Sequence, residues 1–370
     1  MPAMSQYPPQ GQWPRQPQAG TGYPAARQMQ QPMQQAQPVQ QPSTSLPKED
    51  LAWAKATVDR IFAFYDSRMV GQPDLRTTLV TAMVAGGHVL LESVPGLAKT
   101  TAAKALADAV SGDFSRIQCT PDLLPSDIVG TQIYNSATSK FETRLGPVFS
   151  NFVLLDEVNR SSAKTQAAML EAMQERQVTI GDKTYPLSSD MFMVVATQNP
   201  VEQEGTYPLS EAQEDRFLFK ETLAYPTIDE EIEILGRIES GQMVREAEAV
   251  ASVKDVRRLR HMARKVFVQP SLKRYMAAIV AATRNPRASL PPELARYVRM
   301  GASPRATIAL LEGAKAIALV YGRGYVVADD VKYLCRPVLR HRMTLGYSAV
   351  ADDLPVETVI DALVSRIPTP

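Results

Sequence analysis

The sequence of 370 residues predicts an α/β domain with a parallel sheet and helices on both faces, followed by an all-α domain. Short apolar runs alternate with helical patterns between residues 88 and 223, which is typical of strands joined by helices. Helical patterns alone follow residue 229, and the first 47 residues show neither pattern. We therefore divide the chain into a tail at 1–47, an α/β domain at 48–228 and an all-α domain at 229–370.

The tail at 1–47 contains ten prolines and thirteen glutamines, and two arginines are its charged side chains. Because it has few aliphatic side chains to bury, we expect it to stay disordered. A passive, solubilising tail is the simpler interpretation. A tail that docks on a partner or associates with itself is the alternative, for which the scattered Tyr7, Trp13 and Tyr23 are the indication.

Order is expected to begin at Pro47, because a proline followed by acidic residues suits the first turn of a helix. Apolar residues then recur at helical spacing from Leu51 to Tyr65. The α/β domain is predicted to contain further helices at 74–85, 99–111 and 163–176, and strands at 88–92, 114–118, 152–156, 191–197 and 217–223. The all-α domain is predicted to contain helices at 232–238, 253–266, 272–284, 304–321 and 328–340.

Charge and composition exclude several classes of protein. Lys and Arg total 40 against 39 Asp and Glu, which does not favour a protein held on nucleic acid by bulk charge. Two cysteines, Cys119 and Cys335, cannot form a disulfide framework and are interpreted as small core residues. The longest uncharged apolar stretch, 77–91, is too short to span a membrane, and the first residues do not resemble a signal peptide. A cytoplasmic protein without membrane insertion is therefore expected.

A short loop between a predicted strand and a predicted helix has the composition of a phosphate-binding loop. It consists of Val94, Pro95, Gly96, Leu97, Ala98, Lys99 and Thr100. In this setting backbone N–H groups bind phosphate, Lys99 contacts the β- and γ-phosphates, and Thr100 binds Mg²⁺. Ser93 and Ala98 replace glycines of the motif G-x-x-x-x-G-K-[ST]. A positive φ at Ser93 would cost about 1 kcal/mol, and an ordinary strand–turn–helix corner is the alternative interpretation.

Two further strands end in polar residues that suit the same chemistry. Asp156 and Glu157 follow the apolar run Phe-Val-Leu-Leu, so they are expected beside the loop at the carboxyl edge of the sheet. Asp156 would hold Mg²⁺ through water and Glu157 would accept a proton from the attacking water. Asn199 follows the run 191–198 and could orient that water. A pair of solvated acids and a simple turn are the alternatives for these positions.

Two arginines are candidates for contacts with phosphoryl charge. Arg216 precedes a buried-looking Phe-Leu-Phe run, and Arg305 opens a helix of the all-α domain. A guanidinium group stays ionised and binds phosphate in a bidentate manner. From the residues alone, an ordinary surface or salt-bridge arginine is the simpler interpretation of each.

Together with their surrounding segments, these residues resemble the MoxR family of AAA+ ATPases over residues 48–370. The matching segments are VGQ at 70–72, GGHVLLE at 86–92, VPGLAKT at 94–100, TPDLLPSDIVGTQ at 120–132, LLDEVNR at 154–160, KTQAAMLEAMQERQVTI at 164–180, ATQNPVEQEGTYPLSEAQEDRF at 196–217, GASPRA at 301–306 and PVLRHRM at 337–343. A match of this length and order is specific.

The resemblance implies a role for each candidate residue. The loop 94–100 resembles Walker A, and Asp156 with Glu157 resembles Walker B. Asn199 is similar to sensor 1, Arg216 to an arginine finger that reaches into the neighbouring subunit's site, and Arg305 to sensor 2, which reports nucleotide state from the lid. The family also implies an AAA+ lid at 229–370, ATP and Mg²⁺ as cofactors, and a homo-oligomeric ring, expected to be a hexamer.

Further expectations follow from the same resemblance. Residues 121–146 match the helix-2 insert and 178–185 match the hairpin before sensor 1, and both are expected to face the pore. A separate protein with a von Willebrand factor A domain is the expected partner, together with a protein client of unknown identity.

The leading hypothesis is an ATP-hydrolysing machine that remodels or matures client proteins, in which ATP closes the lid on the α/β domain. A nucleic-acid motor is the rival, supported by Arg257, Arg260, His261 and Arg264 on one predicted helical face. The hairpin turn with Gly181, Asp182 and Lys183 is not basic enough to favour it. A nucleotide-gated scaffold with little turnover stays open because of Ser93, and a P-loop kinase is disfavoured because the resemblance includes no acceptor domain.

Overall fold

The computed structural model describes residues 46–94, 96–188, 191–200, 206–241 and 248–370. Residues 1–45 of the predicted tail lie outside the described residues, and so does Pro95 of the predicted phosphate loop.

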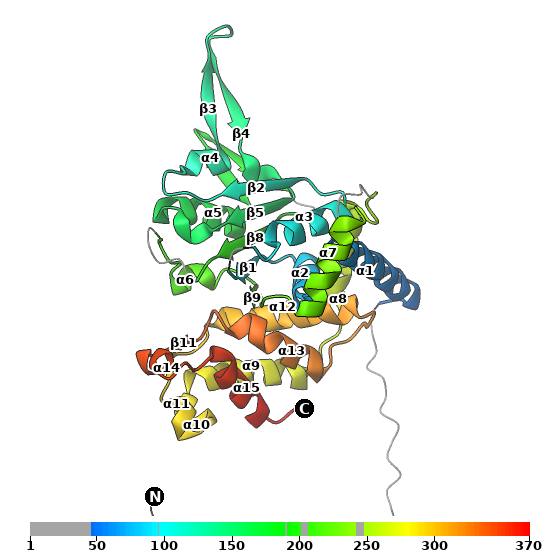
Figure 1. Ribbon diagram of the computed structural model, residues 1–370, viewed down its shortest axis with the longest axis vertical. Coiled ribbons are helices and arrows are strands. Elements are labelled where there is room, and N and C mark those ends of the chain that lie inside the picture. The colour runs from blue at the N-terminus through cyan, green and yellow to red at the C-terminus, as the bar shows by residue number, and fades with distance from the viewer. Residues whose placement is uncertain (1–45, 95, 189–190, 201–205, 242–247) are drawn as a thin grey trace, which may run out of the picture. The chain divides into compact units, whose positions relative to one another are not determined.

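A five-stranded parallel sheet forms the centre of the α/β part (Figure 1). Its strands are β1 (Val89–Glu92), β2 (Phe114–Gln118), β5 (Phe152–Asp156), β8 (Met193–Gln198) and β9 (Phe219–Thr222). They lie in the order β2-β5-β8-β1-β9, and each neighbouring pair is parallel. The five predicted strands are therefore confirmed, with ends that differ by one or two residues. Because all strands run the same way, their carboxyl ends meet at one edge of the sheet.

The two faces of the sheet are buried in separate apolar clusters. On β5, Phe152 and Leu154 join one cluster, whereas Val153 and Leu155 join the other. This alternation follows from the two-residue period of a strand. It requires helices on both faces, as the apolar runs predicted. Helix α5 covers one face, whereas α1, α2 and α3 cover the other.

The helices described in the α/β part are α1 (Lys48–Arg68), α2 (Pro73–Ala85), α3 (Lys99–Ala109), α4 (Pro125–Val129), α5 (Ala163–Glu175) and α6 (Glu211–Glu214), with single 3₁₀ turns at Pro147–Phe149 and Val158–Arg160. The four helices predicted for the α/β part are confirmed as α1, α2, α3 and α5, whereas the short helices α4 and α6 were not predicted. Helix α2 ends at Gly86, whose φ of +83° only glycine adopts at little cost. The N-terminus of α5 is capped by Ser162, whose hydroxyl accepts from the Thr165 N–H.

The chain after residue 227 is mostly helical. Its helices are α7 (Ile228–Glu239), α8 (Val253–Lys265), α9 (Pro270–Arg284), α10 (Pro286–Ser289), α11 (Pro292–Ala295), α12 (Pro304–Val320), α13 (Ala328–Leu339), α14 (Tyr347–Ala351) and α15 (Val356–Arg366). The five predicted helices are confirmed. Helix α15 was not predicted, although its buried Val359, Ile360 and Leu363 have helical spacing.

The prediction that strands are absent from this part is wrong. Strands β10 (Val298–Met300) and β11 (Thr344–Leu345) form a short antiparallel pair. Two- and three-residue strands are too short to show a period in the sequence.

Two antiparallel hairpins project from the α/β part. The first, β3 (Gly130–Asn135) with β4 (Lys140–Leu145), extends away from the sheet (Figure 1). It lies within the region that resembles the helix-2 insert. The second, β6 (Gln177–Ile180) with β7 (Lys183–Pro186), turns at Gly181 and Asp182 as predicted.

One apolar cluster runs from the helices of the α/β part into the helices of the all-α part. Ile61 of α1 and Leu79 of α2 belong to the same buried cluster as Leu310 and Ile317 of α12. The two cysteines are buried free thiols, as predicted. Within the described part of the chain, no helix is long and apolar enough to cross a membrane.

A buried histidine should make the stability of this core depend on pH. The His88 Nδ1 accepts a hydrogen bond from the Val194 N–H at 2.9 Å, and Nε2 lies 3.3 Å from the Met173 carbonyl. Burial, and secondly the charge of Arg176, lower the pKa of His88 from 6.5 to about 3. Between pH 6.5 and about 3, His88 is therefore protonated in the unfolded chain but neutral in the folded chain.

We expect the free energy of unfolding to fall as the pH drops from 6.5 toward 3, by up to about 1.4 kcal/mol per pH unit for this group. The variant His88→Gln keeps a donor and an acceptor but does not titrate. Urea unfolding at pH 7, 6 and 5 should show a shallower pH dependence for His88→Gln than for the native chain. Equal slopes would show that His88 is protonated in the folded protein.

Candidate nucleotide site

The predicted phosphate loop lies between β1 and α3, at the carboxyl edge of the sheet. Lys99 is the first residue of α3, and its Nζ donates to the carbonyl oxygens of Ser93 and Val94, both at 3.4 Å. Gly96 has a φ of +88°, and a Cβ added there would meet open space. The loop therefore curves around the ammonium group beneath the positive end of α3, as phosphate binding requires.

Of the two residues that replace glycines of the motif, Ala98 has a strained, left-handed backbone conformation and Ser93 does not. Ser93 is buried, its N–H donates to the Gln198 carbonyl at 3.2 Å, and its φ is not positive. Ala98 has a φ of +50° at the N-cap of α3. A side chain in this left-handed region costs about 1 kcal/mol. The expectation that Ser93 strains the loop therefore does not apply.

Asp156 ends β5 as a buried carboxylate with partners on both oxygens. The Thr197 hydroxyl donates to Oδ1 at 2.8 Å. Arg116 of the neighbouring strand β2 donates to Oδ2 from Nε at 3.1 Å and from Nη2 at 2.6 Å. Sequence reasoning missed Arg116. The parallel register pairs Gln118 with Asp156, which puts Arg116 on the same side of β2, two residues earlier.

Glu157 stands beside Asp156 in a left-handed backbone conformation, with a φ of +56°. Its N–H donates to the Thr197 hydroxyl at 2.8 Å, so one threonine holds both acids. Its carboxylate accepts from Gln118 Nε2 at 3.1 Å and pairs with Arg160 Nε at 3.1 Å. To accept a proton from water, the Glu157 carboxylate has to free an oxygen lone pair from its contacts with Gln118 and Arg160.

Asn199 is buried directly after β8, and its carbonyl accepts from Asn159 Nδ2 at 3.4 Å. The strand order puts β8 between β5 and β1. The structure thus brings together Lys99, Thr100, Asp156, Glu157 and Asn199 at the carboxyl edge of three adjacent strands.

The residues at this edge fit a nucleotide with Mg²⁺. Hydroxyl and carboxylate oxygens, here those of Thr100 and Asp156, are the protein ligands that Mg²⁺ prefers. Among the described residues there is no cluster of three His, Cys, Asp or Glu side chains suited to a metal.

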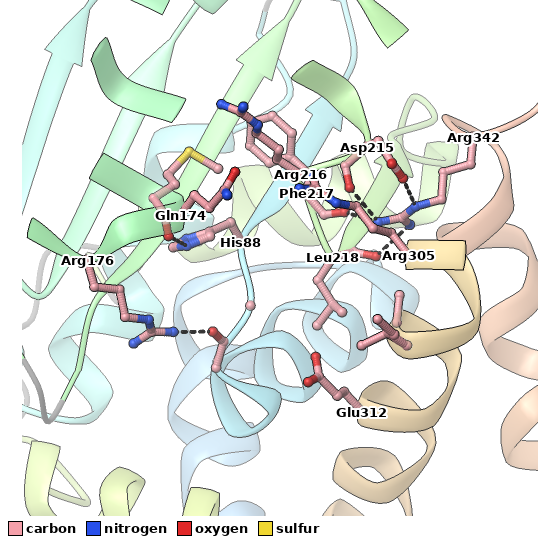
Figure 2. A pocket seen from close by; sticks show the side chains of 15 residues that line it. His88, Gln174, Arg176, Asp215, Arg216, Phe217, Leu218, Arg305, Glu312 and Arg342 are labelled. Carbon is pink, nitrogen blue, oxygen red and sulfur yellow. Dashed lines mark hydrogen bonds and ion pairs between the residues drawn. The ribbon is translucent and has the colours of Figure 1, made fainter. Parts of the chain in front are cut away.

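The structure brings the two predicted arginines together, but at the opposite edge of the sheet. Arg216 and Arg305 line one cavity of about 290 Å³, with Gly86, Gly87 and His88 on its wall (Figure 2). Residues 86–88 precede β1, and Arg216 precedes β9. The cavity therefore lies at the amino ends of these strands, whereas the phosphate loop follows the carboxyl end of β1. Both guanidinium groups are exposed.

Asp215 joins the segment of Arg216 to the helix of Arg305. Its carboxylate accepts from Arg342 Nε at 2.7 Å and from the Ser303 hydroxyl at 2.8 Å. Ser303 is the N-cap of α12, and Arg305 is the second residue of that helix. Figure 2 shows the Asp215–Arg342 ion pair at the same pocket as Arg216 and Arg305. Sequence reasoning missed this link, because its members are far apart in the chain.

Arg342 is a buried cation just beyond α13, and it donates its hydrogen bonds to this segment and to the last turn of α13. Besides Asp215, it donates to the carbonyls of Phe217, Leu218 and Val338. Burial lowers the pKa of Arg342, and the Asp215 carboxylate opposes that shift. Removing one member of a buried pair leaves an uncompensated charge, which costs about 3–5 kcal/mol.

The basic row on α8 is not the continuous surface that a nucleic-acid motor would need. Arg260 is buried, and its Nε donates to the Met83 carbonyl at 2.9 Å, near the end of α2. Arg257, His261 and Arg264 are exposed. Arg260 thus links α8 to α2 and does not belong to an exposed basic surface.

The strain at Ala98 can be tested by one substitution and its matched control. Ala98→Gly should raise the free energy of unfolding by up to about 1 kcal/mol, because glycine adopts a positive φ without strain. Ala103→Gly, in the interior of the same helix, should lower it by about 1 kcal/mol. Chemical denaturation of the three proteins measures both effects. If the two variants lose stability equally, Ala98 does not have the left-handed conformation.

Comparisons with known proteins agree with this geometry. The family model "ATPase family associated with various cellular activities (AAA)" matches residues 88–219, and the model "AAA lid domain" matches residues 294–363. The chain is 45% identical to Chaperone MoxR1 of Mycobacterium tuberculosis over 322 residues, which cover 87% of this chain and 85% of that protein. It is 45% identical to the uncharacterized protein YeaC of Bacillus subtilis, over 82% of this chain and 91% of that protein.

A crystal structure from Cytophaga hutchinsonii superposes with a TM-score of 0.82 and 44% identity, over 87% of this chain and 98% of that one. The matched segments include the phosphate loop, the two acids of β5 and the helix of Arg305. The chain therefore belongs to the MoxR family of AAA+ ATPases.

Proposed function

We propose that this protein hydrolyses ATP in sites that are shared between the subunits of a ring, expected to be a hexamer, and uses the energy to remodel or mature client proteins. The observation that carries the proposal is the separation of the site residues. The phosphate loop, the two acids and Asn199 lie at one edge of the sheet, and Arg216 and Arg305 lie at the opposite edge. A chain that supplies both sets can complete a site only by meeting another copy of itself head to tail, which is the arrangement of closed rings.

Each residue has a defined task in this proposal. Lys99 and the backbone of the loop bind the phosphates, and Thr100 and Asp156 hold Mg²⁺, which neutralises phosphate charge when it is bound. Asn199 orients the attacking water, and Glu157 takes its proton. The Gln118 amide and the Arg160 guanidinium hold the Glu157 carboxylate before this step.

Arg216 and Arg305 are proposed to act together on the nucleotide of the neighbouring subunit. Both are exposed at the same cavity, and Asp215 with Ser303 joins their segments. A guanidinium group brought to the transferred phosphate stabilises the charge that develops there. This differs from the expectation of a lid that closes on the nucleotide of its own chain, because Arg305 lies at the edge opposite to its own phosphate loop.

The β3–β4 hairpin is the proposed contact with clients. Tyr134 and Phe141 form an edge-to-face pair on it with ring centroids 5.4 Å apart, and both rings are exposed together with Ile133. Exposed aromatic side chains are typical of surfaces that bind other proteins.

The client is proposed to be presented by a separate protein with a von Willebrand factor A domain. A cytoplasmic location is proposed, since ATP is supplied there.

The first test is the release of phosphate from ATP as a function of protein concentration, with and without Mg²⁺. We expect the specific activity to rise with concentration, because sites form only between subunits. Arg216→Ala should lower the activity by about 10³-fold or more without preventing assembly. Arg274→Ala, at an exposed position on α9, is the matched control and should keep native activity. Activity that is independent of concentration and of Arg216 would refute the shared site.

Mixing inactive variants tests which subunit's nucleotide Arg305 serves. Arg305→Ala chains mixed with Lys99→Ala chains should recover activity at about one quarter of the interfaces, where the intact loop of one chain meets the intact arginines of the other. Arg305→Ala mixed with Arg216→Ala should recover none, because every interface then lacks one arginine. The reverse pattern would mean that Arg305 serves the nucleotide of its own chain.

A further inference from the structure

Helix α7 presents an apolar stripe that the described part of the chain leaves uncovered. Ile228, Ile232, Leu235 and Ile238 are 77%, 61%, 61% and 58% exposed. Within the described residues no side chain of α7 is buried, although its sequence is that of an amphipathic helix. An apolar stripe of four large side chains on one helix is typical of an interface with another protein.

The opposite side of α7 is firmly attached to the protein. Arg237 donates to the carbonyl oxygens of Asp66 and Met69, at 2.6 and 3.3 Å, at the end of α1. Glu230 packs against Gly71, where an added Cβ would lie 2.3 Å from its carboxylate oxygen. The helix is therefore held in place, and its apolar stripe faces away from these contacts.

The location of α7 connects the stripe with the nucleotide site. The helix follows β9, and the Leu223 N–H, just beyond that strand, donates to the Glu92 carbonyl at the carboxyl end of β1. The chain thus enters α7 from the same edge of the sheet as the phosphate loop (Figure 1). In the proposed ring, a subunit that brings its arginines to this loop would therefore also come near α7.

The charges around the stripe match the surface that carries those arginines. Glu231 and Glu239 fall on the helical face of Ile228, Ile232 and Leu235, and α7 as a whole has five acidic residues and one arginine. The opposite edge of the molecule presents Arg216 and Arg305, together with Ile308, which is 55% exposed on α12 one turn beyond Arg305. An acidic, apolar helix and a basic surface with an exposed isoleucine are complementary in charge and polarity.

We propose that the α7 stripe is a docking surface for a second copy of this chain, and that it receives the surface around Arg216, Arg305 and Ile308 of the neighbouring subunit. The inference rests on the proposed shared site and adds the surface that holds the two subunits together there. In this arrangement α7 supplies apolar area and acidic charge beside the nucleotide. The contact is head to tail, so it repeats around a closed ring.

The test is the double variant Ile232→Asp/Leu235→Asp in the full-length protein, with Val350→Asp as the control. Val350 is 79% exposed on α14, so both sets of substitutions change exposed aliphatic residues of helices. Sedimentation velocity with Mg²⁺ and ATP should show that the α7 variant needs an about tenfold or higher protein concentration to assemble. Its specific activity should shift to the same higher concentration and reach the native plateau. The control should match the native chain in both measurements.

A second variant tests the charge match and guards against a loss of helix α7. Glu231→Lys/Glu239→Lys keeps the apolar stripe and should also weaken assembly, more strongly at low salt, because it places lysines against the neighbour's arginines. Glu293→Lys, at an exposed position on α11, is its control. A maleimide cross-linker should join Ile232→Cys chains to Ile308→Cys chains in a mixture, because both native cysteines are buried.

The outcomes separate this inference from the proposed function. If the native chain shows a concentration-independent activity that ignores Arg216, the shared site itself is wrong. If the shared site holds but both α7 variants assemble and hydrolyse ATP like the native chain, the α7 proposal is overturned. The stripe would then belong to the N-terminal segment or to a different protein. Cross-links that form equally within unmixed Ile232→Cys chains would also overturn it.

Discussion

The buried ion pair between Asp215 and Arg342 is the interaction on which the second half of the site depends. It ties the segment that ends in Arg216 to the all-α part, and Asp215 at the same time accepts from Ser303 at the start of the Arg305 helix. The Arg342 guanidinium also donates to the carbonyl oxygens of Phe217, Leu218 and Val338. A charge buried in this way is stable only when every donor has a partner, so the geometry around it has little freedom. The two segments that carry the exposed arginines are therefore held together.

The parallel sheet imposes the other constraint. Because β1, β5 and β8 run in one direction, the residues that follow these strands lie at one edge of the sheet, and the residues that precede them lie at the opposite edge. Thr197 on β8 then holds both acids of β5, through Asp156 Oδ1 and the Glu157 N–H. The phosphate loop uses the adjacent strand. The sheet thus assembles one half of the chemistry and keeps it about one strand length from the arginines.

These two constraints explain why a single subunit is an incomplete catalyst in the proposed function. The half-site with the loop offers positive potential and oxygen ligands, but its acids are held by Arg116, Gln118 and Arg160. The half-site with Arg216 and Arg305 offers two exposed cations and no phosphate loop. In the proposed ring, association of two copies would supply each half with what it lacks. The exposed stripe of α7 and the exposed aromatic pair of the β3–β4 hairpin are two separate surfaces, which we propose for the next subunit and for a client, respectively.

The sequence by itself determined the local features of this protein. The five sheet strands, the loop around Lys99, the acids after β5 and the β6–β7 turn are encoded by contiguous residues with a period or a motif, so they could be predicted from the chain alone. The family could be recognised for the same reason. Tertiary structure alone decided which of these features meet. Arg116 contacts Asp156 from the neighbouring strand, and Asp215 contacts Ser303 and Arg342, which lie about a hundred residues away in the chain. Of the two positions where the loop departs from the glycine motif, Ala98 has the positive φ and Ser93 does not. The physical reason is that these contacts depend on strand order and on packing between distant segments, and neither leaves a periodic signal in the sequence.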